Sequence, residues 1–157
     1  MHPFGIARSI SQCPNWPWQL LLCLLFCWSD ATTFGQGDPI QADVRARAES
    51  AYDAGDFLAA LPDYERLVSL FPEEACLHGR LAGCALKEPG RLSLVRRHLR
   101  LALRMGCNDV DLGFHQARLA QLEYDFERAR DLYAAYLIAG GKKARFKTEA
   151  ETAALSC

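Results

Sequence analysis

The feature of this sequence that most constrains its fold is a repeat with a period of 34 to 35 residues. Phe57 is followed by Leu92 after 35 residues and by Phe126 after a further 34. The same spacing relates Ala60, Val95 and Ala129; Tyr64, Leu99 and Tyr133; and Ala48, Gly83 and Ala117. A fixed period of this length is typical of stacked supersecondary units, each of which buries its apolar face only against its neighbours.

The segments between the repeat positions are predicted to be helices. After about residue 40 the chain is rich in Ala, Leu, Arg and Glu, with apolar residues at helical spacing and without the two-residue alternation of strands. Gly and Pro interrupt this pattern at Gly55, Pro72, Pro89-Gly90, Gly106 and Gly140-Gly141. The sequence therefore predicts an all-α fold of about six helices in short-looped pairs.

The run from Gly55 to Ala60 (GDFLAA), followed by Tyr64 and Pro72, resembles the turn and second helix of the tetratricopeptide-repeat (TPR) family. Leu92 and Val95 depart from the family pattern, and Tyr124 takes the turn position that glycine usually holds. The resemblance covers about residues 40 to 140. It implies a short right-handed solenoid of three hairpins, at about residues 41–74, 75–108 and 109–141, in a domain of residues 38–157.

Side-chain size at the repeat positions suits such packing. The small residues are expected to let helix backbones approach each other, and the large residues Phe57, Tyr64, Phe126 and Tyr133 to fill the space between consecutive hairpins. The last hairpin needs a cover, which residues 144–157 are expected to supply as a capping helix. The helical stripe that would face the core consists of Phe146, Ala150, Ala153, Ala154 and Cys157.

Residues 1–35 are predicted to form a signal peptide. An apolar run of about thirteen residues from Trp16 to Trp28 follows Arg8, whereas a membrane-spanning helix needs roughly twenty. Thr33 and Gly35 suit cleavage before Gln36. Export to the periplasm, cell envelope or medium is favoured over retention as an anchor, so no stable membrane span is expected after cleavage.

The arrangement of a signal peptide, three repeats and a further helix is similar to the N-terminal module of bacterial envelope proteins that continue into a β-propeller and an outer-membrane-protein-A-like domain. The chain is expected to be either a short relative of these proteins or a truncated one.

The TPR resemblance also implies a partner-binding groove lined by the first helix of each hairpin. The register places nine residues there: Arg45, Glu49, Tyr52, Arg80, Cys84, Lys87, Phe114, Arg118 and Gln121. Two aromatic residues beside four cations suit an extended peptide or an acidic segment. The alternative is an ordinary solvated helix face. Arg96, Arg100 and Arg104 form a second stripe, which suits either an acidic partner or lipid headgroups, or only keeps the protein soluble.

Four cysteines, Cys76, Cys84, Cys107 and Cys157, would remain after signal cleavage. Cys76 and Cys107 occupy nearly equivalent positions in successive units, and export would let a disulfide persist, so we hypothesise a Cys76–Cys107 bond. The alternative is that these cysteines are small buried hydrophobic residues.

The pattern of polar residues does not suggest catalysis. The sequence has no HExxH, GxSxG or glycine-rich phosphate loop, and no cysteine or histidine spacing typical of zinc. We therefore expect no enzyme activity, cofactor or metal site. The net charge of −1 does not favour nucleic acid as a partner.

The predicted function is an exported scaffold for a protein or peptide partner, and the alternative is a structural subunit that self-associates through its terminal helix.

Overall fold

The computed structural model describes residues 39–157, so the predicted signal peptide and its cleavage site lie outside the described residues. The described chain contains seven α-helices and a 3-10 helix, and no strand occurs within it. The elements are α2 (Pro39–Asp53), α3 (Phe57–Leu70), α4 (Ala75–Ala85), α5 (Leu92–Arg104), α6 (Asp111–Leu122), α7 (Phe126–Gly140), η1 (Gly141–Lys143) and α8 (Lys147–Ser156). The predicted all-α fold is confirmed.

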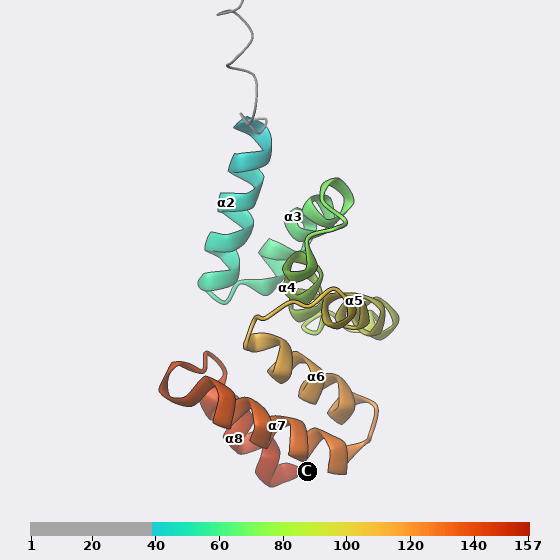
Figure 1. The fold of residues 1–157 in the computed structure, drawn as a ribbon, viewed down its shortest axis with the longest axis vertical. Helices are drawn as coiled ribbons and strands as arrows, with labels where there is room; N and C mark the ends of the chain where they lie inside the picture. The colour runs from blue at the N-terminus through green and yellow to red at the C-terminus, as the bar shows by residue number, and fades with distance from the viewer. Residues whose placement is uncertain (1–38) are drawn as a thin grey trace, which may run out of the picture. The chain divides into compact units, whose positions relative to one another are not determined.

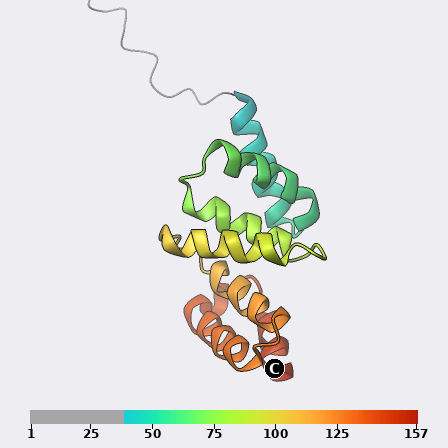
Figure 2. The ribbon, with the colours of Figure 1, turned by 90° about the vertical axis from the view of Figure 1, so that its right-hand side faces the viewer.

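The helices form consecutive hairpins, in which α2 packs on α3, α4 on α5 and α6 on α7 (Figures 1 and 2). Each hairpin also packs against the next, α3 against α4 and α5 against α6, and α8 packs on α7. The result is a helical-repeat architecture. No helix between residues 39 and 157 has both the length and the apolar character that crossing a bilayer requires.

The turn inside each hairpin repeats with the sequence period. Gly55, Gly90 and Tyr124 all adopt a left-handed backbone, with φ of 80°, 87° and 64°. Glycine adopts this conformation without steric cost, whereas a tyrosine does so at the expense of strain. The side chains of Asp56 and Asp125 then cap α3 and α7 by accepting hydrogen bonds from the backbone N–H groups of Ala59 and Arg128.

The small repeat positions are buried where helices cross. The buried members are Ala48, Ala60, Gly83, Val95, Ala117 and Ala129. Tyr64, Leu99 and Tyr133, one helical turn beyond the second set of small positions, are buried beside them. Large side chains thus fill the space that the close backbones leave, as the period predicts.

The prediction for Phe126 is wrong. Its side chain is 43% exposed, and Tyr124 is the aromatic residue that packs against it, at a centroid distance of 6.1 Å. Its counterpart Phe57 is half-buried, and the rings of Tyr52 and Phe146 pack against it at centroid distances of 5.2 and 6.0 Å. Phe146 packs on Phe114 and not on Phe126, so the Phe126 side chain stays open to solvent.

The C-terminal segment packs as its stripe predicts but begins its helix later. Residues 141–143 form η1, and α8 begins at Lys147. Phe146, Ala150 and Ala153 are buried, with Ala154 and Cys157 packed against them. These residues belong to one cluster with Phe114, Ala117, Tyr133 and Tyr136, which covers the inner side of the third hairpin.

Gly83 permits the closest packing of this core, so we predict that Gly83→Ala destabilises the protein. An added Cβ would overlap His115 Nε2 and would force that buried ring to move. We expect a loss of about 1–3 kcal/mol in the free energy of unfolding, measured by urea denaturation. Gly113→Ala is the matched control, since its Cβ would meet Tyr136 at an ordinary 3.6 Å. Equal stability of the two variants would contradict the prediction.

Candidate partner-binding groove

The nine predicted groove residues differ in exposure. Glu49 and Lys87 are exposed, and Arg45, Arg80, Arg118 and Gln121 are partly exposed. Tyr52, Cys84 and Phe114 are buried, with exposed fractions of 1%, 0% and 2%. These three side chains pack inside the protein and have no surface that a partner in solution can touch. The two aromatic contacts that the sequence suggested are therefore part of the core.

The face that Tyr52 would present is covered by Arg145, which comes from the segment between η1 and α8. The Arg145 guanidinium lies over the Tyr52 ring at 4.9 Å and donates a hydrogen bond of 2.8 Å to the Tyr52 carbonyl oxygen. It also forms an ion pair with Asp53 at 2.5 Å. The end of the chain thus reaches back to the first hairpin, more than 90 residues earlier.

Phe146 covers Phe114 in the same way. The two rings stack with centroids 4.3 Å apart, and the Phe146 ring also packs against Phe57 and His115. The backbone N–H of Phe146 donates a hydrogen bond of 2.9 Å to the Tyr136 hydroxyl. Residues 145–157, which we call the docked segment, therefore occupy a large part of the predicted groove.

His115 lies beneath the docked segment and is fully enclosed. Its Nε2 shares a hydrogen bond of 3.0 Å with the Tyr52 hydroxyl, while its Nδ1 is buried without a partner among the described residues. Burial lowers the pKa of His115 to about 3, and the nearby cations Lys87, Arg145 and Arg80 add to this effect. The imidazole is therefore neutral at physiological pH.

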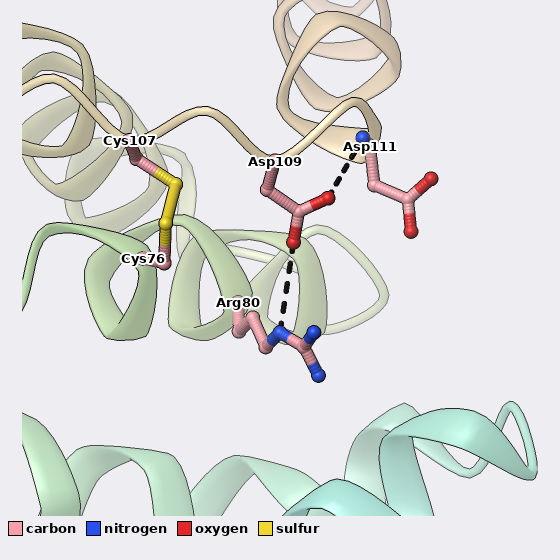
Figure 3. Close-up of a disulfide and its surroundings, with 5 residues drawn as sticks. All are labelled: Cys76, Arg80, Cys107, Asp109 and Asp111. Atoms are coloured by element: carbon pink, nitrogen blue, oxygen red, sulfur yellow. Dashed lines mark hydrogen bonds and ion pairs between the residues drawn. A yellow bond between two sulfur atoms is a disulfide. The ribbon is translucent and has the colours of Figure 1, made fainter. Parts of the chain in front are cut away.

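The hypothesised disulfide is present. Cys76 at the start of α4 is bonded to Cys107, with their Cα atoms 5.0 Å apart, a separation typical of disulfides (Figure 3). The alternative, a small buried hydrophobic residue, describes Cys84 instead. Burial raises the pKa of the Cys84 thiol to about 12, so that thiol stays protonated.

The disulfide anchors the loop that carries acidic residues into the groove. In Figure 3, Arg80 on α4 points toward Asp109, with Nε 3.6 Å from the carboxylate, and Asp109 accepts a hydrogen bond from the Asp111 backbone N–H. Asp111 in turn lies 3.5 Å from Arg145. Burial and the neighbouring Asp109 raise the pKa of Asp111. Asp109, Asp111 and Arg145 were not predicted from the sequence, since none of them occupies a repeat position.

At the first hairpin, Arg45 is already engaged. It donates two hydrogen bonds to the Glu74 carboxylate, at 2.9 and 2.8 Å, and lies over the Phe71 ring. Because this bidentate pair holds the guanidinium, a partner at Arg45 would have to compete with Glu74.

One open part of the groove is a crevice between α6 and α8, which we call the α6/α8 crevice. It has a volume of about 560 Å³ and contains two of the predicted groove residues, Arg118 and Gln121. The other side is formed by residues of α8, namely Thr148, Glu149, Thr152, Ala153 and Ser156. The C-terminal helix was expected to cap the last hairpin or to self-associate, and a part in the groove was not expected, although Thr148 and Thr152 fall one turn apart on a polar face.

Neither a known family model nor a characterised protein matches this sequence. In residues 39–157, no three side chains of His, Cys, Asp or Glu come together to hold a metal ion.

The disulfide closes a separation of 31 residues, so its loss is expected to destabilise the fold. We predict that Cys76→Ser/Cys107→Ser lowers the free energy of unfolding by about 2–4 kcal/mol, mainly because the unfolded chain gains conformational freedom. Urea denaturation with and without a phosphine reductant measures this effect. The reductant should lower the free energy of unfolding of the native protein and of the Cys157→Ser control, but not that of the double variant. Native protein that is indifferent to the reductant would contradict the disulfide.

The buried neutral His115 predicts a dependence of stability on pH. In the folded state its pKa is about 3, whereas an unfolded histidine titrates near 6.5, so the unfolded chain binds more protons between these values. The free energy of unfolding should therefore fall as pH decreases from about 6.5 toward 3, by up to a few kcal/mol. His115→Gln should show a shallower fall in urea denaturation over the same range. Identical slopes for the two proteins would refute this.

Proposed function

We propose that this chain is an exported TPR scaffold, without catalytic activity, that binds an extended segment of a partner protein in the α6/α8 crevice. The observation that carries the proposal is the open crevice of about 560 Å³ in which Arg118 and Gln121 face the polar side of α8. Export rests on the predicted signal peptide, and the TPR assignment on the repeat pattern of the sequence.

The chemistry of the crevice suits a polypeptide backbone. Arg118 supplies a cation, Glu149 an anion, and the threonine hydroxyls can both donate and accept hydrogen bonds. Such a lining can pair with the N–H and C=O groups of an extended chain. Arg118 already donates a hydrogen bond of 2.7 Å to Gln121 Oε1, which orients both side chains at the crevice wall.

Two side chains of types that often act in catalysis, Cys84 and His115, are withheld from solvent. Cys84 is buried as a protonated thiol, and His115 is enclosed and neutral. Neither side chain can meet a substrate in this conformation, which supports a binding role over an enzymatic one.

The alternative is a structural subunit that self-associates through its C-terminal end. Phe146, the aromatic residue of the C-terminal stripe, is buried and is not available for this contact. Ile138 on α7 and Leu155 on α8 are instead 84% and 91% exposed, and these two side chains favour the alternative. An assembly through them would cover apolar surface that the described chain leaves in water.

Two single substitutions on α8 separate the functions. Thr152→Arg places a long cation in the crevice opposite Arg118, whereas Leu155→Arg removes an exposed apolar residue outside it. We predict that Thr152→Arg abolishes partner binding and that Leu155→Arg retains it. The measurement is crosslinking of the tagged full chain in its native host, with mass spectrometry of the envelope and medium fractions.

Size-exclusion chromatography with light scattering completes this test. A monomer in all three proteins, with partner capture lost only in Thr152→Arg, would agree with the scaffold. Capture unaffected by Thr152→Arg would refute binding in the crevice. An oligomer that Leu155→Arg dissociates would favour the structural subunit.

A further inference from the structure

The outward face of α5 concentrates positive charge. Arg96, Arg97, Arg100 and Arg104 are all exposed, and α5 contains no acidic residue. The chain as a whole has a net charge of −1, so this density of arginine is local to one face. A local excess of one sign attracts partners of the opposite sign.

Most of these arginines are unpaired. Among residues 39–157, the guanidinium groups of four arginines form no ion pair or hydrogen bond: Arg97, Arg100, Arg104 and the neighbouring Arg128. Elsewhere, ion pairs hold Arg45, Arg47, Arg80, Arg91 and Arg145. The guanidinium groups of Arg97, Arg100 and Arg104 on α5 therefore remain available to an external anion.

A cleft lies beside these arginines, between α5 and the α6/α7 hairpin. Its volume is about 240 Å³. Three arginines from two helices surround it: Arg96, Arg100 and Arg128. Its apolar lining consists of Leu99, Leu103, Leu119 and Ala120. We call this site the arginine cleft; it shares no lining residue with the α6/α8 crevice.

The protein itself shows how a carboxylate sits at this cleft. Glu123 Oε1 accepts hydrogen bonds from Arg96 Nε and Nη2, at 2.8 and 2.5 Å. One cation of the cleft is thus occupied by an internal carboxylate, while Arg100 and Arg128 on the same cleft have none. Carboxylates from a partner can form the same charge-assisted contacts there.

We propose that the arginine cleft binds an acidic peptide segment of a partner protein, with an apolar side chain seated on the leucine-lined floor and flanking carboxylates on Arg100 and Arg128. The combination of unpaired cations and an apolar floor favours a peptide over a lipid surface. Lipid headgroups could reach the exposed arginines, but a flat bilayer surface has no side chain to place in the cleft.

The test uses the purified full chain and a fluorescein-labelled peptide, Asp-Glu-Glu-Leu-Glu-Glu-Phe-Asp, followed by fluorescence anisotropy. One control peptide replaces Leu and Phe with Ser, and another replaces the acidic residues with Asn and Gln. Vesicles of phosphatidylglycerol and phosphatidylcholine, assayed by sedimentation, probe the lipid alternative. We expect binding of the first peptide that weakens with added salt, and weaker binding of both control peptides.

Charge reversal locates the site. Arg100→Glu/Arg128→Glu is expected to weaken peptide binding by about tenfold or more, because two charge-assisted contacts become repulsive. Arg66→Glu/Arg130→Glu changes the net charge equally at exposed positions outside the cleft, so its affinity should stay within about twofold of the native protein. Leu103→Ser, at a half-exposed floor position, should reduce the advantage of the first peptide over its serine control.

Three outcomes would overturn the proposal. Equal loss of peptide binding in the two charge-reversal variants would mean that only the overall charge matters. Equal affinity for the first peptide and its serine control would remove the role of the floor. Vesicle binding without peptide binding would assign the face to lipid. Thermal unfolding by circular dichroism must show the same midpoint for both charge-reversal variants, so that misfolding does not explain the difference.

Discussion

His115 lies where the first and third hairpins, α4 and the docked segment meet, and the surrounding structure depends on how this ring is accommodated. Its hydrogen bond to Tyr52 joins α6 to α2, and Phe146 packs against it from the C-terminal side. The ring fits there only because Gly83 on α4 has no side chain. One missing Cβ thus allows three helices to meet around a neutral imidazole, whose charged form the enclosed site would strongly disfavour.

That junction also determines how much of the groove stays open. Phe146 stacks on Phe114 beside the His115 ring, and the neighbouring Arg145 donates hydrogen bonds to Tyr52 and Asp53. The C-terminal segment consequently covers the inner surface between the first and third hairpins in addition to capping the last one. Along α8, from Thr148 to Ser156, the surface opens again into the α6/α8 crevice, which is one accessible part of the groove.

Much of the fold was predictable because small and large residues recur every 34 to 35 positions, and side-chain size decides where helices can pack closely. The sites of close helix packing, such as Ala48 and Ala117, and the left-handed turn at Gly55 follow directly from the period. The exposed Phe126 was not predictable from the same period, because a repeat position is buried only if another element covers it. The repeat likewise placed the predicted groove residues correctly along their helices but could not show which of them reach solvent. Tyr52, for example, is buried.

The sequence by itself determined the all-α class, the spacing of the hairpins and the stripe of α8 that faces the core, because helical periodicity and side-chain volume act locally or between adjacent units. It also brought Cys76 and Cys107 into equivalent positions, although their bond requires the loop after α5 to fold back onto α4. Only the tertiary structure decided that Arg145 crosses to the first hairpin, and that Arg96 finds Glu123 while Arg100 and Arg128 remain unpaired. Those contacts join residues with no fixed sequence spacing, so their formation depends on how the helices stack in three dimensions.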